Sequence, residues 1–261
     1  MKKYWAILRI QLSNNLAYPV DLLSRSISIV FFMWVFAQLW RATYASTGQQ
    51  TIAGLTLHDT LWYLMLSETI LLSKPRLARA IAEAVKDGSI AYVLNKPYNF
   101  LVYYASVGLG DSLVSLVFNI LAGGTVVWIM VGPPPSPAGW PFVLITVVFA
   151  WLIDFCISAM IGLAAFITED VAAFEWIYSK ILFLLGGLLI PLDFFPAWLR
   201  TIAQATPFAY TLYGPARLFV TFDWERLGTL LFGQMLWLAV LGLALGLLFR
   251  RGVAWLTING G

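Results

Sequence analysis

The sequence predicts an all-α polytopic membrane protein with six transmembrane helices, an N-terminal interfacial amphipathic helix and a short outer helical insertion before the last span. Of its 261 residues, 61% are apolar and 11% are charged, whereas a soluble domain is about half apolar and about a quarter charged. The mean hydropathy is +0.82. Apolar segments of roughly 20 residues, the length that crosses the hydrocarbon, recur along the chain. Residues 1–261 are therefore interpreted as a single transmembrane domain.

The composition also excludes several classes of function. The formal net charge of +3 is too small an excess to indicate nucleic-acid binding. Cys156 is the single cysteine and His58 the single histidine. An internal disulfide, a cysteine metal cluster and a multi-histidine metal site within one chain are therefore excluded. The partner that the composition does predict is the lipid bilayer.

The first predicted element is an amphipathic helix over residues 2–18, which Pro19 ends. Apolar residues recur in it at helical spacing, with polar and basic residues elsewhere around the helix. The apolar positions are Trp5, Leu8, Leu12 and Leu16, and the others include Lys2, Lys3, Arg9, Gln11 and Asn15. Such a helix lies in the inner membrane interface. A basic tail that only sets the topology is the alternative.

Six apolar segments then qualify as membrane spans. The last is the clearest because it holds no charged residue, and the second is the weakest because it contains Glu68. The fifth has Pro191 near its end. The spans are residues 22–40, 57–73, 100–131, 140–167, 176–195 and 227–249. The apolar stretch 196–210 is too short to cross and is expected to form a re-entrant or surface-lying helix, within an outer insertion over residues 196–226.

Lysine and arginine are denser on the side that holds both termini. That side carries Lys2, Lys3, Arg9, Lys74, Arg76, Arg79, Lys86, Lys96, Arg250 and Arg251, and the other carries Arg41, Arg200, Arg217 and Arg226. Because short cytoplasmic loops are enriched in positive charge, both termini are predicted to be cytoplasmic, in a multi-pass protein of the cytoplasmic membrane.

The longest predicted cytoplasmic segment follows the second span and contains a short amphipathic helix. Asp87-Gly88 provides its stop signal. One face carries Arg76, Arg79, Glu83 and Lys86, and the opposite face carries Leu77, Ile81, Ala84 and Val85. Two interpretations remain open: a loop helix that sets the topology, and a docking element for a cytosolic partner.

Four features together resemble a permease subunit of the ABC-2 class of ABC transporters, in the branch of short six-span permeases. They are "DGSIAYVLNKP" at residues 87–97, "LGGLLIPLDFFPAWLRTIAQATPFAY" at 185–210, "YGPARLF" at 213–219, and the Tyr4-Trp5 amphipathic start. The resemblance covers essentially the whole chain. It implies an exporter whose ATP and Mg²⁺ are bound by separate cytosolic ABC ATPase subunits, and a second permease subunit of the same or a similar chain.

The sequence agrees with that division of labour. No G-x-x-x-x-G-K-[ST] motif occurs, and the dipeptide Gly-Lys is absent, so the phosphate-binding loop is not in this chain. We expect no catalytic residue, cofactor or metal here. The resemblance implies that residues 75–96 hold the coupling helix, with Asp87 and Gly88 fixing its end. This helix would pass the movement of the ATPase to the second and third spans.

Charges within spans are costly and often functional. Glu68 is a candidate for the translocation path, together with Gly186 and Gly187 as a weak point in the fifth span. For Asp111 and Asp154, pairing with neighbouring groups is the preferred interpretation. Gly242-x-x-x-Gly246 in the last span permits close helix packing, and packing within one subunit is expected there.

Three alternatives remain. An ion- or proton-coupled secondary transporter would use Glu68, Asp111 and Asp154, although the two halves show no matching repeat. A membrane anchor for a cytosolic ATPase is a second class. The third is a remote one: Gly108-Leu109-Gly110-Asp111 matches the G-x-G-D signature of intramembrane aspartyl proteases, but Asp154 follows the motif instead of preceding it. The transported substrate and the permease stoichiometry are not encoded in any recognisable pattern.

Overall fold

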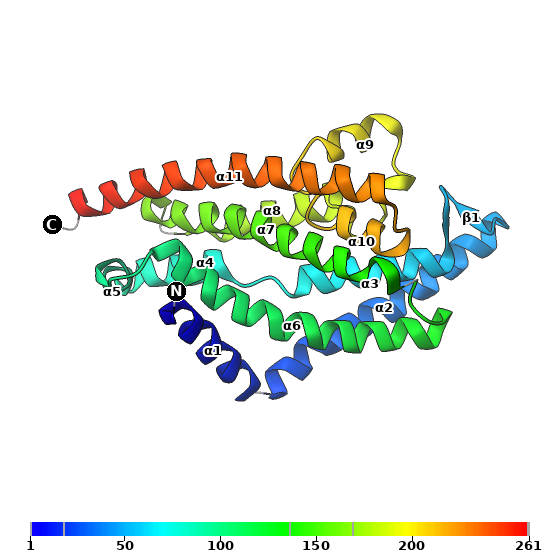
Figure 1. Ribbon diagram of the computed structural model, residues 1–261, viewed down its shortest axis with the longest axis horizontal. Coiled ribbons are helices and arrows are strands. Elements are labelled where there is room, and N and C mark those ends of the chain that lie inside the picture. The colour runs from blue at the N-terminus through cyan, green and yellow to red at the C-terminus, as the bar shows by residue number, and fades with distance from the viewer. Residues whose placement is uncertain (1, 18, 136, 169, 260–261) are drawn as a thin grey trace.

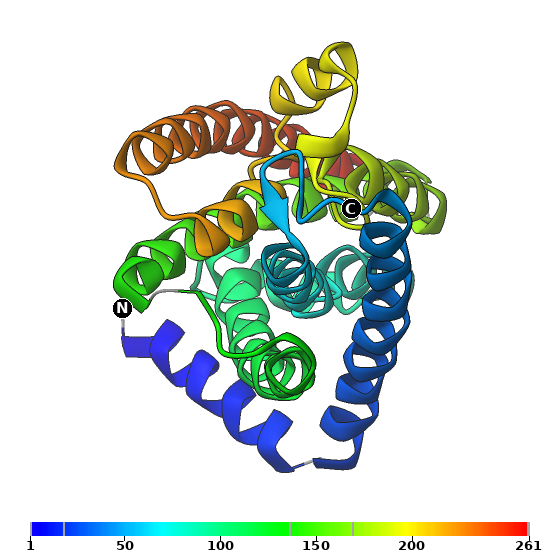
Figure 2. The ribbon, with the colours of Figure 1, turned by 90° about the vertical axis from the view of Figure 1, so that its right-hand side faces the viewer.

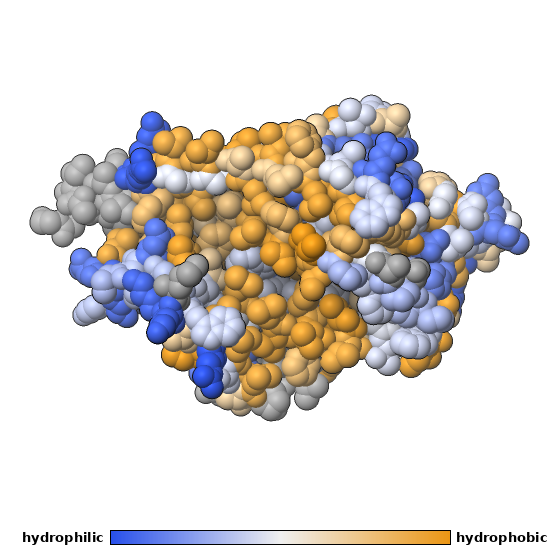
Figure 3. Space-filling view, viewed as in Figure 1, coloured by the Kyte–Doolittle hydropathy of each residue, from blue (hydrophilic) through white to orange (hydrophobic). Residues whose placement is uncertain are grey.

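The computed structural model describes residues 2–17, 19–135, 137–168 and 170–259, with the side chains of these residues except 19–26, 138 and 253–259. Long helices run side by side along the longest axis of the molecule (Figure 1). On the face shown in Figure 3, hydrophobic residues form a broad central belt and hydrophilic residues gather toward the two ends. One end carries α4 (Leu77–Lys86), and the other carries a hairpin of β1 (Thr51–Ile52) and β2 (Leu55–Thr56). We call them the α4 end and the hairpin end.

Two helices form the N-terminal part. α1 (Lys2–Ala17) is followed by α2 (Pro19–Thr47), and Pro19 suits the first position of a helix because it has no N–H to leave unbonded. Figure 2 shows α1 and α2 meeting at a sharp angle at one edge of the bundle. α2 extends beyond the predicted first span and leads into the hairpin, which the sequence analysis did not predict. Ala53 and Gly54 form its turn with φ of 50° and 78°.

The second predicted span is the central helix of the bundle. α3 (Leu57–Leu72) is buried without interruption from Thr60 to Ile70, and it packs against α2, α6 (Phe100–Val131) and α10 (Tyr213–Val220). A capping box fixes its start, since Thr56 and Asp59 bond reciprocally across the first turn. Protein therefore surrounds most of this weakly apolar helix.

Two long helices pack along each other beyond α6. α7 (Trp140–Thr168) follows a 3-10 turn at Pro137–Gly139, and α11 (Trp224–Asn259) lies against it. The buried Gln234 of α11 fixes their register, since its Nε2 donates to the carbonyl of Thr146 at 2.9 Å and to that of Tyr210 at 3.0 Å. The third and fourth predicted spans coincide with α6 and α7 to within one residue, and α11 contains the sixth predicted span and extends beyond both of its ends.

The fifth predicted span is wrong as a single helix over residues 176–195. α8 (Ala172–Leu185) begins earlier and ends at Gly186. Gly187 has a φ of +71°, a left-handed conformation that glycine adopts without strain and that terminates helices. After it come a 3-10 turn (Leu192–Phe194), α9 (Ala197–Gln204) and α10. α9 lies on the surface and α10 is buried between α3 and α7; that residues 196–226 form an outer insertion stays a prediction.

Four helices are long and apolar enough to cross a membrane within the described residues: Ile27–Thr47, Phe100–Val131, Trp140–Thr168 and Trp224–Gly252. α3 has 16 residues and α8 has 14, which correspond to about 24 and 21 Å at ~1.5 Å per residue. Both are shorter than the other four helices, and α3 is also less apolar because it carries Asp59 and Glu68.

Candidate functional site

The candidate site at the α4 end is built on the contact between α4 and α7. Leu77 and Ile81 are buried in a cluster that includes Leu163 of α7, as the predicted apolar face requires. A Cβ on Gly162 would lie 2.9 Å from Ile81 Cδ1 and 3.2 Å from Ala78 Cα. Only glycine lets the two helices approach this closely. The apolar face of α4 is therefore covered by this same chain.

The opposite face of α4 is polar and exposed, as predicted. It presents Arg76, Arg79, Glu83 and Lys86. The Nε of Arg79 donates to Oε2 of Glu175, in the first turn of α8, at 2.7 Å. The backbone N–H of Ala172 and the positive charge of Lys86 lower the pKa of Asp170. Two basic residues of α4 thus face acidic residues at the start of α8.

The contacts of α4 involve other helices than the two predicted spans next to it in the chain. The sequence analysis connected the 75–96 segment to the second and third spans, because it lies between them in the chain. In the structure, α4 packs on α7 and forms an ion pair with α8. α4 therefore contacts the helices that correspond to the fourth and fifth predicted spans.

The predicted stop signal of α4 is confirmed. α4 ends at Lys86 with Asp87 as its C-cap, and Gly88 has a φ of +75°. Asp87 Oδ1 accepts the backbone N–H of Ser89 at 2.8 Å, and hydrogen bonds from Ser89 lower the pKa of the Asp87 carboxyl. The turn is therefore fixed both by glycine and by the aspartate.

A second short helix was missed by the sequence analysis. α5 (Ile90–Asn95) follows the turn, and its Tyr92 is 76% exposed. The signal was present in the run of helix-compatible residues between Gly88 and Pro97. An exposed aromatic side chain therefore follows the turn at the end of α4.

Asp154 lies in a buried ion pair. Lys74, just after α3, pairs with Asp154 of α7, and Tyr178 of α8 donates to the same carboxylate. Lys74 Nζ also lies 3.2 Å from the Tyr178 hydroxyl and 4.6 Å from the centre of its ring. The expected structural pairing of Asp154 is confirmed, and the cluster joins three helices immediately before α4.

Asp111 is paired as well, with α1. Gln11 Nε2 and Asn15 Nδ2 each donate to Oδ1 of Asp111 at 2.7 Å. A Cβ on Gly110 would lie 2.8 Å from Cβ of Gln11, so this glycine admits α1 to the surface of α6. The aspartates Asp111 and Asp154 thus bind different partners, which gives the remote protease interpretation no support.

The same contact changes the interpretation of α1. Its Gln11 and Asn15 face α6, while Trp5 and Leu16 are 68% and 59% exposed. The sequence analysis had assigned Trp5 and Leu16 to the same apolar face as Leu8. Polar bonds to Asp111 therefore orient the helix, and its bulkiest apolar residues point outward.

Glu68 is buried in the middle of α3, with 7% of the residue exposed, and its Oε2 has no hydrogen-bond partner among the described residues. Gly186 caps α8, and the carbonyl of Gly187 accepts the hydroxyl of Tyr63, also on α3, at 2.6 Å. The sequence analysis expected these glycines to be a weak point inside a longer fifth span. In the structure, α8 ends at them instead. A role of Glu68, Gly186 and Gly187 in a translocation path stays a prediction.

The expected packing of Gly242 and Gly246 within one subunit is not seen. A Cβ added at either position would meet nothing within 4 Å in the described part of the chain. This face of α11 is open.

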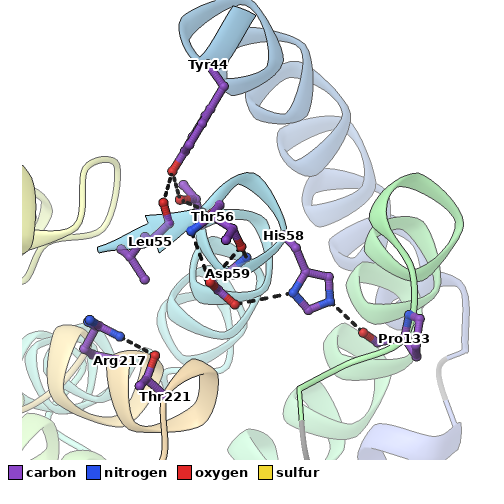
Figure 4. Close-up of polar contacts among 9 residues, drawn as sticks. Tyr44, Leu55, Thr56, His58, Asp59, Pro133, Arg217 and Thr221 are labelled. Atoms are coloured by element: carbon purple, nitrogen blue, oxygen red, sulfur yellow. Dashed lines mark hydrogen bonds and ion pairs between the residues drawn. The ribbon is translucent and has the colours of Figure 1, made fainter. Parts of the chain in front are cut away.

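Polar contacts connect the helices at the hairpin end (Figure 4). His58 Nε2 lies 2.8 Å from the carbonyl oxygen of Pro133, in the loop after α6. The Tyr44 hydroxyl of α2 donates to the Leu55 carbonyl at 2.8 Å. His58 therefore connects α3 to the loop before α7, a role that its lone occurrence in the sequence did not reveal.

Comparison with known proteins gives one family. A family model described as "ABC-2 family transporter protein" matches residues 29–260. No curated protein matches the chain.

Proposed function

Since the chain belongs to the ABC-2 transporter family, we propose that it is the membrane-spanning permease subunit of an ATP-driven transporter. In this proposal a separate cytosolic ABC ATPase binds and hydrolyses ATP, and the permease exports a hydrophobic or amphipathic substrate. A second permease subunit, of the same or a similar chain, completes the path. The observation that carries the proposal is the family match over nearly the whole chain, joined to an exposed polar helix at one end of a hydrophobic belt.

The α4 segment is the proposed coupling helix. Its apolar face is covered by α7, so its exposed polar face is what remains for a partner. Glu83 and Lys86 lie on this face, and Tyr92 of the following α5 is exposed as well. α4 is anchored to α7 by its apolar face and presents a polar surface on its other face. This combination suits an element that transmits movement.

The proposed topology has six spans, with α3 and α8 as the two short ones and both termini in the cytoplasm. Single cysteines at Glu83 and at Thr47, both exposed, are introduced in a Cys156→Ala background. A membrane-impermeant maleimide should label Thr47→Cys in intact cells, and Glu83→Cys only after permeabilisation. Ser136, which also lies in a predicted outer loop, is outside the described residues. Labelling of both cysteines in intact cells would contradict the topology.

ATP-dependent flux tests the function. Vesicles that contain the permease and its ATPase should export a hydrophobic fluorescent dye with ATP, and vanadate should stop the export. The purified chain alone should not bind ATP. Flux that follows a proton gradient without ATP, and that is lost in Glu68→Gln, would instead support a secondary transporter. Intact ATPase binding without any ATP-dependent flux would support a membrane anchor.

A further inference from the structure

A pocket of about 350 Å³ lies between α9, α10 and the start of α11. Ligand pockets typically measure ~300–1,000 Å³. Polar and aromatic side chains line it, with Ala209 and Leu230 as apolar wall. The polar lining consists of Gln204, Tyr210, Tyr213, Arg217, Arg226 and Thr229. In Figure 3, hydrophilic residues cover the start of α11 beside α9.

The two arginines that line this pocket, Arg217 and Arg226, differ in whether their charges are paired within the chain. Arg217 is buried, and its charge is balanced, because its Nε donates to Asp193 Oδ2 at 3.1 Å and its Nη1 donates to Thr221 at 2.6 Å. Arg226 forms no ion pair with any described residue, and its Nη1 is buried without a hydrogen-bond acceptor. The nearby Asp223 accepts the backbone N–H of Arg226, not its guanidinium. Arg226 as a whole is half-buried, but its enclosed Nη1 lacks an acceptor, which is costly, so this pocket favours an anion.

The N-terminal end of α11 also favours a bound anion in this pocket. Arg226 and Thr229 lie in the first two turns of α11, where the helix dipole is positive. Trp198 of α9 and Trp224 of α11 are both 65% exposed. Exposed tryptophans are enriched at the level of the lipid headgroups. The pocket between these two helices therefore lies at headgroup level, where the abundant anion is phosphate.

We propose that this pocket binds a phosphate group, either the headgroup phosphate of a phospholipid or free phosphate. Arg226 provides the guanidinium, whose fork of N–H donors matches phosphate oxygens. Tyr210, Tyr213 and Thr229 surround the attached group. The site lies at the end opposite α4 and is independent of the proposed coupling helix.

Thermal unfolding of the purified protein in detergent tests the proposal. Dioctanoyl phosphatidic acid is compared with dioctanoylglycerol, which has the same chains without the phosphate. Sodium phosphate is compared with sodium chloride at equal ionic strength. A ligand of the folded state raises Tm, so at least one phosphate probe should give a higher Tm than its matched compound. A rise with phosphatidic acid alone assigns the site to a lipid headgroup, and a rise with both probes means that free phosphate suffices.

Arg226→Gln should lose at least half of the phosphate-dependent rise in Tm. Arg41→Gln is the matched control, because Arg41 lies outside the pocket and bonds to the Met130 carbonyl; it should keep the rise. Arg226→Lys keeps the charge without the fork and should retain part of it. An equal rise in Arg226→Gln and the unmodified protein, or no rise with either phosphate probe, would overturn the proposal.

Discussion

Arg79 of α4 and Glu175 of α8 lie 2.7 Å apart, Nε to Oε2, across a sequence separation of 96 residues. Glu175 is in the first turn of its helix, where a carboxylate also stabilises the helix dipole. The pair is exposed on the arginine side and contributes little to stability. Its importance is geometric, because it connects α4 to a helix that follows α7 in the chain.

Charge-reversal variants distinguish the Arg79–Glu175 contact within this chain from a contact between α4 and the proposed ATPase. Arg79→Glu should place like charges together and reduce stimulation of the proposed partner ATPase, and Arg79→Glu with Glu175→Arg should restore most of it. Lys86→Glu, on the same face, should not be rescued by Glu175→Arg. The measurement is ATPase activity of the reconstituted complex. Equal activity of all the single variants and the unmodified protein would leave α4 as a topogenic loop.

Asp154→Asn should destabilise the protein by about 3–5 kcal/mol, because it leaves Lys74 as an uncompensated buried charge. The side chains of Lys74 and Asp154 are 16% and 3% exposed. Lys74→Met combined with Asp154→Leu should cost much less than Asp154→Asn. Thermal unfolding in detergent reports the differences, and Glu83→Gln at an exposed carboxylate is the control. A double variant less stable than Asp154→Asn would contradict this account.

Two glycine substitutions should shift stability in opposite directions. Gly187→Ala forces a φ of +71° on alanine and places its Cβ 2.9 Å from the Tyr63 hydroxyl; a left-handed alanine alone costs about 1–2 kcal/mol. Gly246→Ala meets open space within a helix and should stabilise it by about 0.5–1 kcal/mol. Unfolding curves of the two variants in the same detergent provide the comparison. A Gly187→Ala variant as stable as the unmodified protein would be inconsistent with the described turn.

Asp111→Leu should release α1 from α6, because Gln11 and Asn15 lose their common acceptor. A spin label at Arg9, which is exposed, should then report faster motion, while the folded bundle keeps its Tm within a few degrees. Ser13→Ala, on an exposed position of α1, is the control and should leave the spectrum unchanged. Unchanged motion in Asp111→Leu would show that other contacts hold the helix.

The sequence predicted the elements that depend on local chemistry. The long helices follow from hydropathy, and the end of α4 follows from Asp87-Gly88, because both signals lie within one segment. The partners of Asp111 and Asp154 were not predictable, since Gln11 and Lys74 are far from them in the chain and any polar residue could have served. The premature end of α8 illustrates the same limit. Gly186 and Gly187 were recognised as a weak point, but the hydrogen bond from Tyr63 of α3 to the Gly187 carbonyl could not be read from the sequence.

The premature end of α8 also has a consequence for the surrounding lipid. A helix of 14 residues covers about 21 Å at ~1.5 Å per residue, while the hydrocarbon is about 30 Å thick. Such hydrophobic mismatch is relieved when the bilayer thins beside the short helix. If α8 is a span, the membrane next to it should be thinner than beside α6, and a polar headgroup that crosses there would travel a shorter apolar distance.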